Sequence, residues 1–319
     1  MYKSEPVLTF WSGEVMDGHG RGSFHILNQS YTVVAQFQAA GFGDAMGDLH
    51  EFEITANDTA LVAVYHPIPW DLSELGGSEY GWLLDCTFQE IDIETGELLF
   101  HWNASDHIGI NETYETLYVS DGRTENTAWD FFHLNSIQKD ADGDYLVSGR
   151  VTNCIYKISG KDGHIIWRLQ VKQSVKSYGL HVRHTLTCTS TFRSDFTVDP
   201  SAEFAFQHDA RWLDANQISM TLFSNGPTSN LNHSRGLLLA IDQESMTATL
   251  IQSFTNEAQA FGQYKGSVQA IDPSNSTTNF LVGYGSVPYF AEFDYKGNVL
   301  LDVQWGSTNA VNGYRAYKQ

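Results

Sequence analysis

Five segments of the chain share one pattern, in which two stretches of alternating apolar and polar residues flank a short polar turn. They are residues 24–34, 89–102, 155–167, 238–250 and 290–305. Asp, Asn, Ser or Gly stands at the centre of each, where a tight turn needs these residues, so the pattern predicts β-hairpins. Their spacing of roughly fifty to eighty residues suits the blades of a β-propeller with long loops.

The rest of the pattern also supports an all-β fold. No long stretch places apolar residues at i, i+3, i+4 and i+7, so an α/β fold with crossover helices has little support. A stack of β-sandwich domains would also give many short strands and stays open as an alternative. We expect a propeller, because radial repetition places the same turn in the same local setting. With 319 residues, 42% of them hydrophobic, the chain can bury the core of one large domain over residues 1–319.

The net charge and short sequence motifs limit which partners the protein can bind and where in the cell it is expected. The net charge of −20 argues against nucleic acid and anionic membrane surfaces as partners. No apolar run is long enough to span a bilayer, and residues 1–6 lack the apolar core of a signal peptide. Six N-glycosylation patterns favour the secretory pathway, so we expect a fragment of an extracellular glycoprotein, with a cytosolic protein as the alternative. The patterns begin at Asn28, Asn57, Asn103, Asn111, Asn232 and Asn275.

Metal and redox signals are weak. The three cysteines, Cys86, Cys154 and Cys188, cannot all pair within one chain and have no metal-ligand spacing around them. Residues 140–144 resemble the start of a calcium loop but lack its distal Glu, so we interpret them as a hairpin turn. The sequence also has no Gly-rich phosphate loop. We therefore expect neither a metal nor a cofactor.

Three short motifs each place a histidine beside acidic, amide or aromatic residues. His50 lies in Asp-Leu-His-Glu-Phe, His133 in Phe-Phe-His-Leu-Asn-Ser and His208 in Phe-Gln-His-Asp-Ala-Arg. A single buried histidine of this kind is usually a hydrogen-bonded core residue. Each of the three opens a β-rich unit, however, and a propeller brings its innermost strands to one central channel. We therefore predict that the three imidazoles meet at a functional site.

Eight further segments occur in a fixed order along the chain. They are Leu8-Thr-Phe-Trp-Ser-Gly-Glu14, Asp48-Leu-His-Glu-Phe52, Tyr65-His-Pro-Ile-Pro-Trp-Asp-Leu72, Gly81-Trp-Leu-Leu-Asp85, Phe132-His-Leu-Asn-Ser136, Ile155-Tyr-Lys-Ile-Ser-Gly160, Gln207-His-Asp-Ala-Arg211 and Gly283-Tyr-Gly-Ser-Val-Pro-Tyr289. This order resembles the fungal branch of the arylsulfotransferase family over nearly the whole chain. The resemblance implies a six-bladed propeller related to the bacterial aryl sulfotransferases, which move sulfate between phenols without a nucleotide donor. Family members usually carry a further N-terminal section, which implies that the first blade is incomplete in this chain.

The resemblance implies a role for each histidine. His208 corresponds to the histidine that accepts the sulfuryl group, and neutral imidazole can attack sulfur to form a sulfohistidine. His133 and Asn135 match a His-x-Asn pair that contacts the sulfuryl oxygens. His50 matches the remaining central histidine, a hydrogen-bond donor or proton shuttle, because imidazole titrates near neutral pH.

Two arginines complete the predicted site. Arg150, at the end of the strand Asp-Tyr-Leu-Val-Ser-Gly-Arg, matches the family's sulfate-binding arginine. Guanidinium donors suit this task because they stabilise developing negative charge. Arg211 closes the motif that begins at Gln207, and we expect it to bind substrate as well. The resemblance therefore implies small aromatic substrates, an aryl sulfate and a phenol, and no cofactor.

One stretch departs from the family pattern. A polar, unpatterned piece at about residues 171–191 separates the third and fourth hairpins. It fits neither strand periodicity nor a helix face, so we expect an atypical loop insertion and hypothesise a translated intron. His181, His184 and Cys188 are poor site candidates for this reason, although together they resemble a metal cluster.

We predict an arylsulfotransferase-like enzyme that works through a sulfohistidine, and two alternatives stay open. The propeller could bind a partner or a carbohydrate on its channel face, or the same pocket could serve a cyclase or hydrolase of an aromatic metabolite, since one scaffold hosts many activities. Four aromatic residues either line a cleft for aromatic rings or pack between blades. They are Trp70, Trp82, Trp129 and Tyr289. The oligomeric state stays open.

Overall fold

The computed structural model of the protein describes residues 1–43, 46–171, 193–226, 231–307 and 311–318. In this part of the chain, strands β1 to β21 alternate with loops and with short 3₁₀ helices. The helices are η1 (Ser73–Leu75), η2 (Ala104–Asp106), η3 (Ile110–Glu112), η4 (Glu125–Thr127) and η5 (Pro200–Ala202). None of the helices in the described residues has the length and apolar character that a membrane crossing requires.

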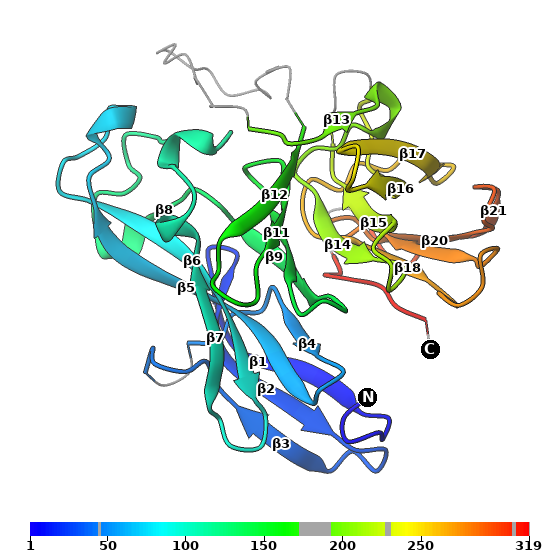
Figure 1. The fold of residues 1–319 in the computed structure, drawn as a ribbon, viewed down its shortest axis with the longest axis horizontal. Helices are drawn as coiled ribbons and strands as arrows, with labels where there is room; N and C mark the ends of the chain where they lie inside the picture. The colour runs from blue at the N-terminus through cyan, green and yellow to red at the C-terminus, as the bar shows by residue number, and fades with distance from the viewer. Residues whose placement is uncertain (44–45, 172–192, 227–230, 308–310, 319) are drawn as a thin grey trace.

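Within the described residues the strands form five sheets, each built from consecutive antiparallel strands (Figure 1). The first sheet contains β1 (Leu8–Met16), β2 (His19–Leu27) and β3 (Val33–Phe37). The second contains β4 (Phe52–Ile54), β5 (Thr59–Trp70), β6 (Gly81–Asp92) and β7 (Leu98–Asn103), with β8 (Trp129–Asp130) parallel to β6. The third contains β9 (Leu134–Lys139), β10 (Tyr145–Gly149), β11 (Cys154–Ile158) and β12 (Ile165–Gln170).

The last two sheets complete the chain. The fourth contains β14 (His208–Trp212), β15 (Ser219–Ser224), β16 (Arg235–Asp242) and β17 (Thr247–Phe254), with β13 (Thr197–Val198) parallel to β17. The fifth contains β18 (Ser267–Ala270), β19 (Phe280–Gly283), β20 (Tyr289–Phe293) and β21 (Val299–Gln304). Apart from the added strands β8 and β13, each sheet is therefore a meander, in which successive strands of the sequence pair with one another.

All five predicted hairpins are present. They are the pairs β2–β3, β6–β7, β11–β12, β16–β17 and β20–β21. A polar side chain fixes the turn of the second hairpin, where Asp92 Oδ1 accepts the backbone N–H groups of Glu94 and Thr95 at 2.9 and 2.8 Å. Asp294 does the same for the last hairpin. These bonds satisfy backbone donors that have no partner in the strand ladder, which explains why a turn follows each such residue.

Each blade packs face to face on the next, as in a β-propeller. Alternate residues of a strand point to opposite faces of the sheet, so sequence neighbours enter different cores. Leu61 packs in the cluster between the second and third sheets, whereas Val62 packs between the first and second. In β16, Leu237 and Leu238 face the third and fifth sheets in the same way. Burial of both faces explains why the middle strands of each blade are strongly apolar.

The all-β propeller is confirmed. The described residues form five blades, one for each predicted hairpin, and the six blades that the family resemblance implies are not confirmed. The first sheet has three strands, and each of the others has at least four. The predicted insertion at about 171–191, with His181, His184 and Cys188, lies outside the described residues from position 172 onward.

Residues 140–144 form the turn between β9 and β10, as predicted. Asp140 Oδ1 accepts the N–H groups of Asp142 and Asp144 at 3.0 and 2.9 Å. The Lys157 ammonium lies 3.1 Å from the Asp140 carboxylate and 3.6 Å from that of Asp144. The Lys157 side chain therefore places a positive charge between these carboxylates. Cys86, which lies in β6, is a buried free thiol, and so is Cys154.

The inner edges of the later blades are joined by polar contacts. The inner strands are β4, β9, β14 and β18, each the first in its sheet. Ala210 of β14 donates its N–H to Ser136 Oγ of β9 at 3.1 Å. The C-terminal segment, residues 311–318, lies along β18 (Figure 1), where Gly266 donates its N–H to the Tyr314 carbonyl at 2.9 Å. The inner edge is thus the place where different blades and the end of the chain meet.

Candidate functional site

Three histidines and a tyrosine gather at the inner edge of the first three blades. His50 immediately precedes Glu51 and β4, and His133 immediately precedes β9, as the sequence motifs suggested. Their ring centroids are 5.0 Å apart with planes at 84°. His19 of β2 lies 5.7 Å from His50 and 5.4 Å from His133, and Tyr65 of β5 lies 5.3 Å from His50. We call these four residues the histidine cluster.

An aspartate fixes each of the two predicted histidines in this cluster. Asp48 Oδ1 lies 2.5 Å from His50 Nδ1 and accepts the His50 backbone N–H at 2.7 Å. Asp130 contacts His133 Nδ1 and accepts the His133 N–H at 2.9 Å. The backbone of His133 has a φ of 54°, an unusual value that lets one carboxylate reach both its N–H and its ring. The two rings are thereby held in defined orientations.

The aspartates also set the proton positions on these rings. Burial alone would raise the pKa of Asp130, but the His133 and His19 rings outweigh it and hold that pKa well below its usual range. The same balance with His50 lowers the pKa of Asp48. Because an ionised carboxylate can only accept hydrogen bonds, each ring presents Nδ1–H to its aspartate and a lone pair at Nε2. Burial lowers the pKa of His133 to about 4, so this imidazole is neutral at neutral pH.

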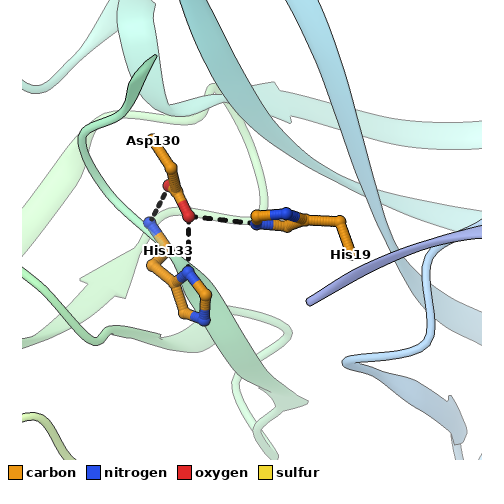
Figure 2. A group of neighbouring side chains, drawn as sticks. All are labelled: His19, Asp130 and His133. Carbon is orange, nitrogen blue, oxygen red and sulfur yellow. Dashed lines mark hydrogen bonds and ion pairs between the residues drawn. The ribbon is translucent and has the colours of Figure 1, made fainter. Parts of the chain in front are cut away.

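His19, Asp130 and His133 form the group most suited to a metal ion (Figure 2). Their potential ligand atoms lie within 4.8 Å of one another, and two imidazoles with a carboxylate suit several transition metals. Figure 2 shows both rings directed at the same carboxylate oxygen, with His19 Nε2 at 3.0 Å from Asp130 Oδ2. Each of these contacts is already a complete hydrogen bond. The three side chains therefore form a complete hydrogen-bonded triad among themselves.

Arg150 borders the histidine cluster as an unpaired cation. It lines a cavity of about 200 Å³ together with Glu115, Trp129, Asp130 and His133. No carboxylate of the described residues lies within ion-pair distance of Arg150; its Nη2 donates only to the Gln263 carbonyl at 3.3 Å, and its buried Nε has no partner. Burial lowers the pKa of Arg150, although Glu115 and Asp130 oppose this. A half-buried guanidinium with unused donors is suited to bind an anion.

His208 lies close to Arg150, with both ring nitrogens engaged. Its Nδ1 lies 2.7 Å from Asn225 Oδ1, and its Nε2 accepts the Lys265 backbone N–H at 3.1 Å. The amide nitrogen of Asn225 donates to the carbonyls of Gly262 and Lys265, which leaves its oxygen for the His208 ring. Burial and the charge of Arg150 hold the pKa of His208 well below its usual range. The ring is therefore neutral, with its lone pair on Nε2 beside a backbone donor.

Arg211 is placed differently from the other predicted residues. Its guanidinium forms ion pairs with Glu51 at 2.6 Å, Glu53 at 2.6 Å and Asp209 at 3.0 Å. It also donates to the Ile137 carbonyl at 2.7 Å. The structure does not bring Arg211 to the cavity as a free cation, so its substrate-binding role stays a prediction without geometric support. Asp209, next to His208, takes part in this ion-pair network through its contact with Arg211.

Asn135 is fully buried within the inner strands. Its amide nitrogen donates to the Gln207 carbonyl at 2.7 Å, while its side-chain oxygen has no partner. Its backbone carbonyl accepts a hydrogen bond from Arg315 at 2.8 Å. The amide donor therefore faces the next blade, and the predicted contact with sulfuryl oxygens would need it to turn.

Sequence analysis missed several residues of this site. His19 carries no motif, Tyr65 lies in a quoted family segment but was given no role there, and the partners of both lie far away in the sequence. Asp130 could have been found, because it stands three residues before His133, as Asp48 stands two before His50. Of the aromatic residues considered, Trp129 lines the cavity with Arg150, and Tyr289 lines a second cavity beside the C-terminal segment.

A comparison with known protein families finds a match over most of the chain. The model of a protein family described as arylsulfotransferase (ASST) matches residues 1–306. No curated protein matches the chain. Similar solved structures include a protein of unknown function from Bacteroides caccae, with 13% identity and a TM-score of 0.45 over 89% of this chain and 76% of that one.

Two further structures are similar at low sequence identity. One is a catalytically inactive virginiamycin B lyase from Staphylococcus aureus with quinupristin, at 9% identity and a TM-score of 0.42, covering 97% of this chain and 74% of that one. The other is a β-propeller domain from Myceliophteria thermophila, at 10% identity and a TM-score of 0.44, covering 96% of this chain and 88% of that one.

Proposed function

Since the chain belongs to the arylsulfotransferase (ASST) family, we propose that it moves a sulfuryl group from an aryl sulfate to a phenol. The observation that carries the proposal is Arg150, a half-buried guanidinium with a buried, unpartnered Nε that lines a cavity with His133. A sulfate ester brings an anionic group that can use these donors. The neutral imidazoles beside it supply the nucleophile and the base that sulfuryl transfer needs.

The transfer proceeds in two steps through a sulfohistidine. In the first, the lone pair of an imidazole nitrogen attacks sulfur, the N–S bond forms, the S–O bond to the aryl group breaks, and the phenolate leaves and takes a proton from solvent. In the second, the acceptor phenol gives its proton to a second histidine, its oxygen attacks sulfur, and the N–S bond breaks. The second histidine then releases that proton to solvent. Atoms and charges balance without any cofactor.

We assign the nucleophile to His208, as the family resemblance implies. Asn225 holds its Nδ1–H, so the lone pair on Nε2 has a fixed direction. Attack on sulfur requires Nε2 to release the Lys265 N–H, which lies 3.1 Å away. That N–H then stands beside the transferred group and can donate to a sulfuryl oxygen, in the manner of an oxyanion hole. His133 is the rival, because no hydrogen bond among the described residues occupies its Nε2.

His50 and His133 are assigned to proton transfer. Each ring is oriented by an aspartate and presents Nε2 to the histidine cluster, where the proton of the acceptor phenol has to go. Burial lowers the pKa of His133 to about 4, so this ring is a weak base. This arrangement resembles other sites in which a carboxylate orients a catalytic imidazole.

Mass spectrometry tests the proposal directly. The purified protein is incubated with an aryl sulfate and then digested, and a peptide heavier by one SO₃ group is sought at each histidine. We expect the group on His208, transfer to an added phenol, and loss of both in His208→Asn. His164→Asn is the matched control, because this ring is 63% exposed on a turn and outside the site. A sulfuryl group on His133 would move the nucleophile there, and no adduct with no transfer would exclude the function.

Two wider expectations belong to the same proposal. We infer a secreted fungal glycoprotein whose complete ring has six blades, because the family resemblance implies this blade number and the acceptor patterns suit the secretory route. Three of the acceptor asparagines, Asn57, Asn232 and Asn275, are exposed on the surface. Expression in a eukaryotic secretory host and treatment with an endoglycosidase would test the modification. No mobility change after treatment would exclude it.

A further inference from the structure

The C-terminal segment, residues 311–318, lies beyond the part of the chain that the family model matches. It is nevertheless fixed to the propeller. Gly313 donates its N–H to the Gly285 carbonyl at 3.0 Å, and Ala316 donates its N–H to Ser267 Oγ at 2.9 Å. The segment therefore brings the side chains of Tyr314 and Arg315 to the inner edge of the blades, where the histidine cluster lies.

Arg315 anchors the segment to the predicted site. Its guanidinium pairs with Glu51 at 2.9 Å and donates to the carbonyls of His50 and Asn135 at 3.1 and 2.8 Å. These two carbonyls belong to residues that precede β4 and lie in β9, so one side chain bridges two blades. The Arg315 guanidinium also lies 5.4 Å from the centroid of the Tyr314 ring. The position of Tyr314 is therefore set by the same contacts that hold His50.

Tyr314 carries an unused donor next to His50. The two ring centroids are 5.7 Å apart with planes at 80°. The Tyr314 hydroxyl is buried, and among the described residues it has no hydrogen-bond partner. Tyr65, on the other side of His50, contrasts with it, because its hydroxyl donates to the Leu134 carbonyl. A buried hydroxyl without a partner is rare and destabilising, which indicates that a bound group normally accepts its hydrogen bond.

Arg150 supplies the second unused donor at this place. Its Nε is also buried without a partner among the described residues. Tyr314 itself lines the second cavity, and His50 links it to the first: the His50 ring centroid lies 5.7 Å from that of Tyr314 and 5.0 Å from that of His133, which lines the cavity with Arg150. The Tyr314 hydroxyl and Arg150 Nε can each donate a hydrogen bond, and neither has an acceptor among the described residues. Together they suit an oxygen-rich anion better than a neutral ligand. Burial raises the pKa of the Tyr314 hydroxyl, so it remains a neutral donor over the working pH range.

We propose that Tyr314 donates a hydrogen bond to the sulfuryl group that Arg150 binds, so that a segment outside the family match completes the site. This inference rests on the proposed function for its substrate, an aryl sulfate, and on the structure for its geometry. The hydroxyl does not enter the covalent steps. It acts as Arg150 does, by stabilising negative charge on the sulfuryl oxygens as the S–O bond breaks.

Tyr314→Phe removes only the hydroxyl and keeps the ring against His50. We expect kcat/KM for the aryl sulfate to fall about ten- to hundredfold, and the Kd for inorganic sulfate, measured by calorimetry, to rise by a similar factor. The melting temperature should stay level or rise, because the lost group had no partner. Tyr80→Phe is the matched control, because Tyr80 is 83% exposed and outside the site, and it should change none of the three values. Tyr65→Phe should lower the melting temperature instead, because it leaves the Leu134 carbonyl unpaired.

The outcomes separate this inference from the proposed function. Wild-type transfer with unchanged kcat/KM and sulfate affinity in Tyr314→Phe would overturn the inference and leave the function intact. Absence of transfer in the wild type, with sulfate binding that Tyr314→Phe weakens, would overturn the function and support the anion contact. A wild type that neither transfers nor binds sulfate would overturn both. A clear fall in the melting temperature of Tyr314→Phe would show that the hydroxyl has a structural partner, which also overturns the inference.

Discussion

Glu51 holds together the inner edge of the propeller, and its removal should destabilise the whole fold. Its carboxylate is 1% exposed and accepts hydrogen bonds from Arg211 at 2.6 Å, Arg315 at 2.9 Å and the Ile137 N–H at 3.1 Å. These partners come from β14, the C-terminal segment and β9, while Glu51 itself precedes β4. The substitution Glu51→Gln removes the charge that balances two buried guanidinium groups and keeps the size of the side chain.

The size of the effect follows from the pKa of this carboxyl. Burial alone would raise it, but Arg211 and Arg315 outweigh burial and lower the pKa of Glu51 from 4.5 to about 2. At about 1.4 kcal/mol for each pKa unit, the ionised form contributes about 3 kcal/mol of folding free energy at neutral pH. Loss of one partner from a buried ion pair costs a similar amount, about 3 to 5 kcal/mol. Because this pKa is lowered by folding, the contribution is present above pH 4.5 and disappears as the pH falls towards 2.

Denaturant unfolding measures this difference. At pH 7 we expect the free energy of unfolding of Glu51→Gln to be about 3 kcal/mol below that of the wild type, with an unchanged m-value. The difference should shrink as the pH falls below 4.5. Glu94→Gln is the control, because its pair with Lys3 at 3.1 Å is exposed and should contribute less than about 1 kcal/mol. Equal stabilities of the two variants at pH 7 would refute the network argument.

Three other predictions follow from single groups. The His133 ring should titrate near pH 4 by NMR. Since folding lowers this pKa, the contribution of His133 to stability is lost as the pH falls from 6.5 to 4. A titration midpoint near 6.5 would contradict its burial beside the cavity. Lys157→Met leaves the Asp140 and Asp144 carboxylates without their cation, so the free energy of unfolding should fall by about 2 to 4 kcal/mol. Added calcium should restore part of this free energy. An unchanged melting temperature would contradict the prediction. Arg150→Gln should raise the Kd for inorganic sulfate at least tenfold. The melting temperature should not fall, because the Arg150 guanidinium has no ion pair to lose. An unchanged Kd would exclude Arg150 as the anion-binding residue.

The hairpins could be predicted because their signal is local. Alternation in the two strands and a polar residue such as Asp92 at the turn lie within about a dozen residues, and each hairpin is stabilised by bonds inside that span. The same five repeats mark the five sheets of the described residues, so they also indicated this count, and they give no sign of the sixth blade that the family resemblance implies. The packing of the sheets could not be predicted in the same way, because Leu61 and Val62 are neighbours in the sequence and enter different cores.

The site was predictable only in part, for the same reason. His50 and His133 could be found because each lies in a short motif beside acidic, amide or aromatic residues, which is a local signal. His19 bonds to Asp130 across 111 residues, and Arg315 reaches the His50 carbonyl across 265, so neither has a local signal. Arg211 lies in a local motif that suggested a ligand contact, but its guanidinium forms ion pairs with carboxylates that include Glu51 and Glu53, which are distant in the sequence. Its motif therefore gave the wrong expectation of a free cation.

The contrast between the arginines explains how a strongly acidic protein can hold an anion. With a net charge of −20, the long-range field of the chain repels an aryl sulfate, so binding has to come from short-range contacts. Arg211 and Arg315 cannot supply them, because Glu51 and Asp209 already neutralise both. Arg150 lacks such a partner, so its donors are left for a ligand. At the proposed site, an acidic background around a locally unpaired guanidinium would therefore favour anions that also bring an apolar ring, since charge attraction alone does not draw them in.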